Sequence, residues 1–104
     1  MEISNAPKPE KPTYEKDFAR SVDLFEKSFK EFQSSSFSAQ KQAYIDVMKE
    51  SLVTMQESAN AMVNTKLNEL KETLKKDLDK YLEDPNNENK NKVSKDILNI
   101  KNNE

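Results

Sequence analysis

The sequence predicts an all-α protein: a helical hairpin, in which a short Phe-rich helix packs against one long central helix, plus a weak third C-terminal helix in a three-helix bundle-like arrangement. Two observations lead to this prediction. Apolar residues recur at steps of three and four along most of the chain, which is the spacing of one face of an α-helix. The 104 residues include no Gly, although Gly is the usual residue of hairpin turns and phosphate-binding loops.

The two ends of the chain differ from the rest in composition. Residues 1–13 contain three of the four Pro residues among charged side chains, a composition that favours extended backbone and buries little apolar surface. We therefore expect a disordered Pro/Lys/Glu-rich tail at 1–13, a single helical domain at 14–101 and a short tail at 102–104.

The first predicted helix covers residues 14–33. Its apolar side chains lie on one face, and four of the five Phe residues of the chain are among them. A fully covered Phe ring contributes roughly 1.5–3 kcal/mol to folding, so this face is expected to supply the largest burial per residue.

The second predicted helix runs without interruption over residues 38–83, because no Pro or Gly occurs there. A Ser-rich turn precedes it, and Ser36 or Ser38 is the expected N-cap. If this turn makes the first two helices antiparallel, Phe25 faces Met48 and Phe18 faces Met55. The first helix is then too short to reach beyond Ala59.

The third predicted helix covers residues 85–101. Asp84 and Pro85 read as an N-cap followed by Pro at the first helical position, and Val93 and Ile97 would cover the leucines of the central helix. Seven Asn residues at and after position 86 make this helix weak, since Asn is a poor helix former.

One segment of the central helix is nearly free of charge. Between Ser51 and Thr65 the only charged residue is Glu57, and small uncharged side chains permit close approach of another helix. We leave two interpretations open, an internal contact between the three helices and an interface with a partner. The candidate interface and core residues are Phe18, Phe25, Phe29, Phe32, Met48, Leu52, Met55, Ala59, Met62, Val63, Leu67 and Leu70.

The composition excludes most kinds of active site. There is no Cys and no His, so thiolate chemistry, the commonest general base and the commonest transition-metal ligand are missing. We expect no enzyme activity, no catalytic or cofactor-binding residues, no metal and no cofactor. The net charge of −2 lacks the basic footprint of a nucleic-acid binder, and no apolar run is long enough for a transmembrane segment.

In outline the chain resembles several families. Its Phe-rich short helix, its long helix with Ala, Met and Leu, and its Asp84-Pro85 break are similar in plan to phasins, which coat polyester granules. Its size, its helical hairpin and its lack of Cys are similar to the WXG100 secreted proteins, although Trp and Gly of their signature turn are absent. Needle subunits of type III secretion systems are also helical hairpins, but their Pro-containing turn has no counterpart here.

Two functions follow as hypotheses. The first is a non-enzymatic assembly or adaptor protein of a secretion or surface system, which acts through helix–helix association with a second copy, a dimer first of all, or with a helical protein partner. The alternative is an amphipathic coat on a lipid or polymer granule surface, as in phasins. We expect a cytoplasmic protein or, as the alternative, one exported without a cleaved signal peptide.

Overall fold

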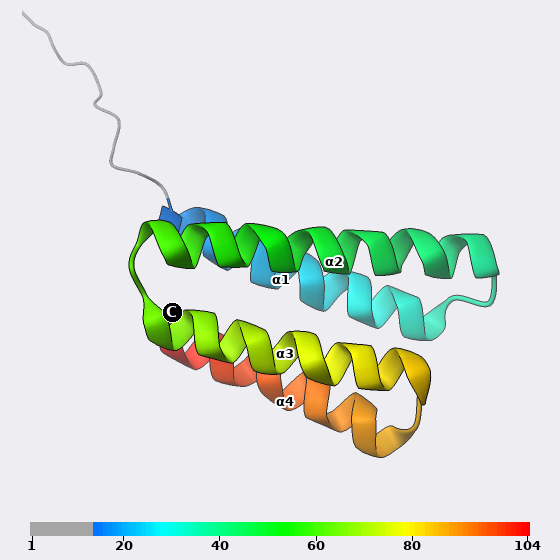
Figure 1. The fold of residues 1–104 in the computed structure, drawn as a ribbon. Coiled ribbons are helices and arrows are strands. Elements are labelled where there is room, and N and C mark those ends of the chain that lie inside the picture. The colour runs from blue at the N-terminus through cyan, green and yellow to red at the C-terminus, as the bar shows by residue number, and fades with distance from the viewer. Residues whose placement is uncertain (1–13) are drawn as a thin grey trace, which may run out of the picture.

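The structure is a computed structural model that describes residues 14–104, and these residues form four helices in an up-down-up-down bundle (Figure 1). The helices are α1 (Tyr14–Ser34), α2 (Ser38–Ala61), α3 (Thr65–Glu83) and α4 (Asn87–Asn103). The predicted all-α class is confirmed for the described residues, whereas the prediction of three helices is wrong. The predicted tail at 1–13 lies outside the described residues.

The first hairpin joins α1 and α2 through residues 35–37, close to the predicted turn. The N-cap of α2 is Phe37, whose side chain makes no capping hydrogen bond, so neither predicted serine has this role. Lys41 Nζ lies 5.3 Å from the centroid of the Phe32 ring, and Ser35 Oγ donates a hydrogen bond to Gln40 Oε1 at 3.1 Å. These contacts agree with the antiparallel register expected from the sequence.

The prediction of one uninterrupted helix over residues 38–83 is wrong, because the chain turns at Met62–Asn64. Asn64 N–H donates to Ala59 O at 2.8 Å and Val63 N–H donates to Asn60 O at 3.0 Å, while Val63 has a φ of 54°. These are the two hydrogen bonds and the left-handed residue of a Schellman motif, in which that residue is usually Gly. With no Gly in the chain, a β-branched residue adopts this conformation at a cost of about 1–2 kcal/mol.

Asparagine side chains hold both sides of this turn. Asn64 is the N-cap of α3, and its Oδ1 accepts a hydrogen bond from Leu67 N–H at 3.0 Å. Asn68 Nδ2 donates across the turn to Asn60 Oδ1, which ties the first turn of α3 to the last turn of α2. The chain therefore reverses where the apolar pattern by itself predicts a straight helix.

The second hairpin joins α3 and α4, and its boundaries differ from the prediction. Asp84 is the C-cap of α3, and Asn86 is the N-cap of α4 because its Oδ1 accepts from Asn89 N–H at 2.8 Å. Asn89, which is buried, also donates through Nδ2 to Asp84 O at 2.8 Å. The Asn residues that predicted a weak helix thus close its first turn, and the helix continues to Asn103.

Replacing Asn86 by alanine should lower the free energy of unfolding by about 1 kcal/mol, because the substitution removes this capping hydrogen bond. Urea denaturation followed by circular dichroism measures the change. Asn99→Ala, in the exposed part of the same helix, is the control and should lose no stability. Equal losses in both variants would contradict the role of Asn86 as a cap.

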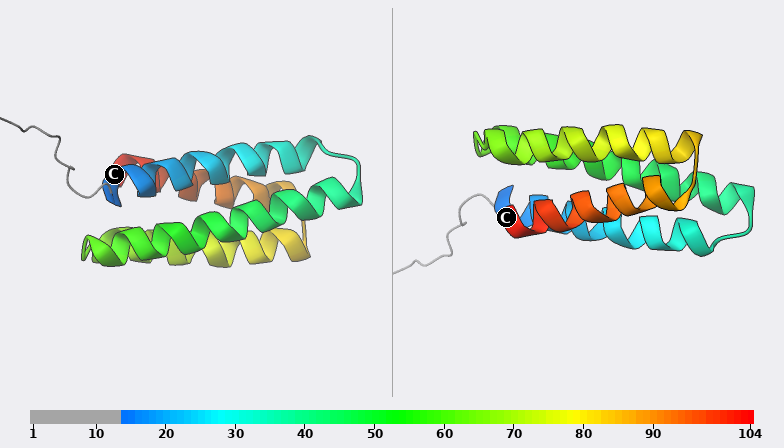
Figure 2. Two further views of the ribbon diagram at one scale, coloured as in Figure 1. Left: turned by 90° about the horizontal axis from the view of Figure 1, so that it is seen from above. Right: turned by 90° about the horizontal axis from the view of Figure 1, so that it is seen from below.

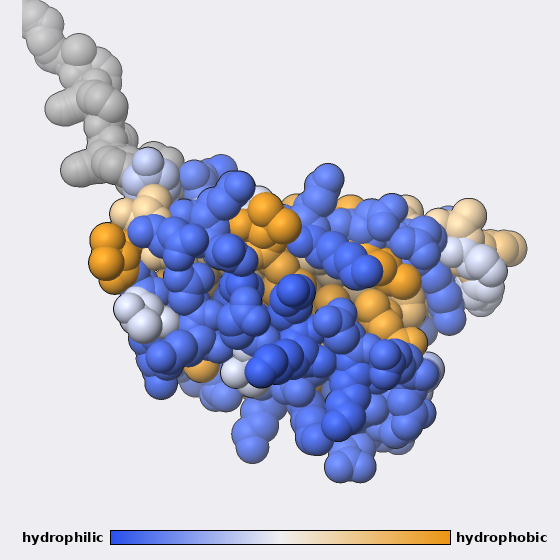
Figure 3. Space-filling model, viewed as in Figure 1, coloured by the Kyte–Doolittle hydropathy of each residue, from blue (hydrophilic) through white to orange (hydrophobic). Residues whose placement is uncertain are grey.

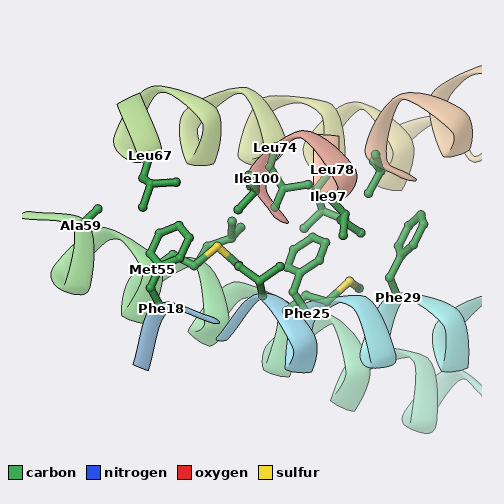
Figure 4. Packing of buried hydrophobic residues seen from close by; sticks show 14 of the residues in the cluster. Phe18, Phe25, Phe29, Met55, Ala59, Leu67, Leu74, Leu78, Ile97 and Ile100 are labelled. Carbon is green, nitrogen blue, oxygen red and sulfur yellow. The ribbon is translucent and has the colours of Figure 1, made fainter. Parts of the chain in front are cut away.

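The core lies between the two hairpins, and side chains of all four helices contribute to it (Figure 4). Packing is closest within each hairpin, and the contact between α1 and α4 is the loosest of the four between neighbouring helices. The views from above and below show α2 beside α3 and α1 beside α4 (Figure 2). Each hairpin therefore covers the apolar face of the other.

Candidate functional site

The candidate interface and core residues are for the most part inside the molecule. Eight of them are buried: Phe18, Phe25, Phe29, Met48, Leu52, Met55, Ala59 and Leu67. Three others, Phe32, Met62 and Leu70, are partly buried against the core, and Val63 is 84% exposed. The apolar strip that we expected a dimer partner to cover is covered instead by the second hairpin, because the chain reverses at Val63.

The nearly uncharged segment Ser51–Thr65 has a buried side and an exposed side, and the sequence left open whether it makes an internal contact or an interface with a partner. Its inner side, with Met55 and Ala59, is buried in the core. Its outer side is exposed and includes Val53, 55% exposed, and Gln56. An internal contact and an uncharged outer surface are therefore both present on the same stretch of α2.

A groove of about 340 Å³ runs along this outer side between α2 and α3. Its lining residues are Lys49, Leu52, Val53, Gln56, Lys71, Lys75 and Asp79. Apolar side chains form a broken row along α2 beside this groove, and a further group stands at the end of the molecule where α2 turns into α3 (Figure 3). The groove thus combines an apolar floor with a rim of two exposed lysines, Lys49 and Lys75, and one exposed aspartate, Asp79.

Lys71 is the most unusual residue of the groove, because it is a lysine that is only 2% exposed. A buried ammonium group is costly unless it is hydrogen-bonded, and Lys71 Nζ donates to Gln56 Oε1 at 2.8 Å and to Glu72 Oε2 at 2.7 Å. The hydrogen bond from Lys71 and its charge hold the pKa of Glu72 below its usual value. These two acceptors use two of the three ammonium donors of Lys71 and compensate for its burial.

The sequence contains a signal for the burial of Lys71. Lys71 lies four residues after Leu67 and three before Leu74, so it occupies a position of the apolar stripe. A charged residue at such a position is either buried with partners or breaks the stripe. Lys49, Val53 and Lys75 carry no comparable signal, because only the packing of α2 on α3 brings them together.

A second polar group is buried between α3 and α4. Asp96 is buried, and its Oδ2 atom has no hydrogen-bond partner in the described part of the chain. Burial, and next the hydrogen bond and charge of Asp77, raise the pKa of Asp96 to about 7, against the weaker opposing effect of Lys92 and Lys95. This carboxyl therefore carries its proton through the acidic range.

The described residues hold no group of three or more Asp, Glu, His or Cys side chains placed to bind a metal ion. Within residues 14–104, no helix combines the length and the apolar character that crossing a bilayer requires. Comparison with protein-family models, with curated proteins and with solved structures finds no match to this chain. We take the groove as the candidate site because a buried, hydrogen-bonded lysine, Lys71, is part of its lining.

Proposed function

We propose that this protein is a non-enzymatic helical adaptor or assembly protein, and that it binds an acidic amphipathic helix of a partner in the groove between α2 and α3. The observation that carries the proposal is the lysine rim over an apolar floor, with Lys71 already buried and hydrogen-bonded at its centre. A helix that binds in a groove inserts apolar side chains spaced three and four residues apart. Carboxylates beside such a stripe would meet Lys49 and Lys75.

The groove fits a helix better than an enclosed small molecule. Sites for small molecules are concave and of about 300–1,000 Å³, and they bury most of the surface of their ligand. The groove is at the lower end of that range, and its lining residues come from two neighbouring helices, α2 and α3. Three of the four residues that line it on α2, Leu52, Val53 and Gln56, are uncharged, and few charges are expected at the centre of an interface.

The alternative of a granule coat places different demands on the molecule. A coat protein presents its apolar face to the lipid or polymer, and here Phe18, Phe25 and Met55 of that face are no more than 1% exposed. The two hairpins would have to separate before such a surface could bind them. We therefore propose the adaptor function, and the coat function remains an untested prediction.

The proposal predicts that reversing the charge of the groove weakens binding. The probe is a synthetic 20-residue helical peptide with leucines at every third and fourth position and glutamates beside them, and its fluorescence anisotropy measures affinity. Replacing both Lys49 and Lys75 by glutamate should weaken binding at least about tenfold, since each charge pair at a partly exposed site contributes up to about 1 kcal/mol and reversal also adds repulsion. Binding of the wild type should weaken with added salt.

The control variant replaces Lys27 and Lys66 by glutamate and so changes the net charge by the same amount. Both lysines are exposed and lie outside the groove. This variant should bind the peptide nearly as well as the wild type. A second peptide in which lysines replace the glutamates should bind less tightly than the acidic one. Equal affinity of the two lysine variants, or of the two peptides, would rule out the groove as the binding site.

A further inference from the structure

The turn Met62–Asn64 combines features that a fixed loop does not need. Val63 adopts a left-handed conformation that costs a β-branched residue free energy, and its apolar side chain is 84% exposed. Both conditions are unfavourable in the four-helix monomer, and both would end if residues 62–64 became helical and the side chain of Val63 were covered.

The sequence around the turn is suited to a straight helix. Residues 38–83 contain no Pro or Gly, and the buried positions Met55 and Ala59 on α2 continue at steps of four through Val63 to Leu67 on α3. In a straight helix these four residues share one face. Straightening would also replace the hydrogen bonds of the turn by ordinary helical ones.

Each hairpin buries its apolar face only against the other hairpin, with contacts that are looser than those inside a hairpin. If the turn straightens, the two hairpins of one chain separate, and their apolar faces need a new cover. A second copy of this chain offers the same two faces. The contacts between hairpins in an exchanged dimer are those of the monomer, made between two chains.

We propose that the turn Met62–Asn64 is a hinge, and that two copies of the chain exchange hairpins through a continuous helix from Ser38 to Glu83. Each α1–α2 hairpin then packs on the α3–α4 hairpin of the second copy. Asn60 and Asn68, which are hydrogen-bonded in the monomer, lie four residues on either side of Asn64. The two-fold axis of the dimer therefore passes close to Asn64, and the Val63 side chains of the two copies lie next to it.

This inference does not depend on the proposed adaptor function, because it concerns the buried faces of the hairpins and not the lysine groove. Variants of Lys49 and Lys75 should leave the dimer unchanged, and variants of the hinge should leave the groove of the folded protein in place. The experiments can therefore show that the hairpin exchange fails while the groove binds the peptide, or the reverse.

The first experiment changes residue 63. The full chain is refolded at high micromolar concentration, and light scattering after gel filtration measures the mass of the species formed. Val63→Gly relieves the strain of the turn and disfavours the straight helix, so it should raise the dissociation constant of the dimer at least about tenfold. Val63→Ala keeps an L-residue in the turn and favours the helix, so it should dimerise more tightly than Val63→Gly. Asn64→Ala, which removes the N-cap of α3, should increase the dimer fraction.

The second experiment separates exchange from association at the surface. Lys101 Nζ on α4 hydrogen-bonds to Glu26 Oε1 on α1, so cysteines at these two positions lie on opposite hairpins, and the chain has no other cysteine. A short bis-maleimide should join the two positions within one chain in the monomer. In the isolated dimer it should join two chains, giving a covalent species of twice the 12.0 kDa monomer mass.

Three results would overturn the proposal. The first is a dimer in which the cross-link stays within single chains. The second is a dimer fraction that is the same in Val63→Gly and Val63→Ala, when circular dichroism shows both to be folded. The third is an Asn64→Ala variant that stays monomeric and instead binds phosphatidylcholine vesicles, which would assign the opened apolar faces to lipid.

Discussion

Replacing Phe25 by alanine is expected to lower the free energy of unfolding by about 3–4 kcal/mol, the usual range for removing a buried aromatic ring. Phe25 is fully buried, and the centroid of its ring lies 6.4 Å from that of Phe29 in a stacked arrangement. The ring points towards Leu78 and Ile97 of the other hairpin (Figure 4). Its ring therefore contributes both to the first hairpin and to the contact between hairpins. Small domains have total stabilities of about 5–15 kcal/mol, so the loss is a large part of the whole.

The matched control is Phe37→Ala, which removes the same ring from a position that is 69% exposed. Its stability should stay within about 0.5 kcal/mol of the wild type. Urea denaturation followed by the helical signal at 222 nm measures both variants. If Phe25→Ala and Phe37→Ala had the same midpoint, the described core would be wrong.

Asp96 should make the protein less stable as the pH rises from about 4 to about 7. Burial and Asp77 raise its pKa from 3.8 to about 7 in the folded state, so the folded protein holds this proton more tightly than the unfolded chain does. Its contribution to the free energy of unfolding is complete below about pH 4 and falls as the pH rises to about 7. The full shift corresponds to as much as about 4 kcal/mol.

Asp96→Asn should remove this dependence, because the amide keeps the shape of the side chain and does not ionise. The variant should resemble the wild type near pH 4 and be more stable by about 2–4 kcal/mol at pH 8, where the wild type carries a buried charge beside Asp77. The difference in melting temperature between variant and wild type, measured from pH 4 to pH 8, isolates Asp96 from the other carboxylates. Glu72 acts in the opposite direction, since its pKa is lowered and its contribution is lost as the solution becomes acid.

The control for this substitution is Asp79→Asn, on the exposed side of α3. It makes the same chemical change without burial, so its difference from the wild type should show no rise between pH 4 and pH 8. A flat difference for Asp96→Asn as well would show that the carboxyl is solvated in the folded protein.

Local pattern predicted most of the apolar residues that are buried in α1, α2 and α3, but it also included Val63, which is exposed. The steps of three and four fixed the helical faces, and the register of the first hairpin followed from matching Phe25 and Phe18 with the methionines of the next helix. The buried positions of α1, α2 and α3 agree with that stripe. Burial of apolar surface is the largest favourable contribution to the free energy of folding. A helix with a periodic apolar face therefore buries that face, even where the connections between helices differ from the prediction.

The functional surface was far less accessible to sequence reasoning. Lys49, Val53 and Lys75 are ordinary exposed residues in the sequence, and they form a groove only because α3 folds back beside α2. Asp96 was likewise unremarkable, since its burial depends on the packing of α4 against α3. Such sites depend on contacts between segments, which periodicity along one segment does not record.

By itself the sequence determined the helical class, the apolar faces and the absence of cysteine and histidine chemistry. The tertiary structure decided that the segment from Ser38 to Glu83 is two helices and not one. The apolar spacing is continuous through Val63, and the missing Gly argues against a left-handed turn there. The turn forms because burying Leu67, Leu74 and Leu78 against the first hairpin, at roughly 1.5–3 kcal/mol each, outweighs the cost of about 1–2 kcal/mol for one strained residue.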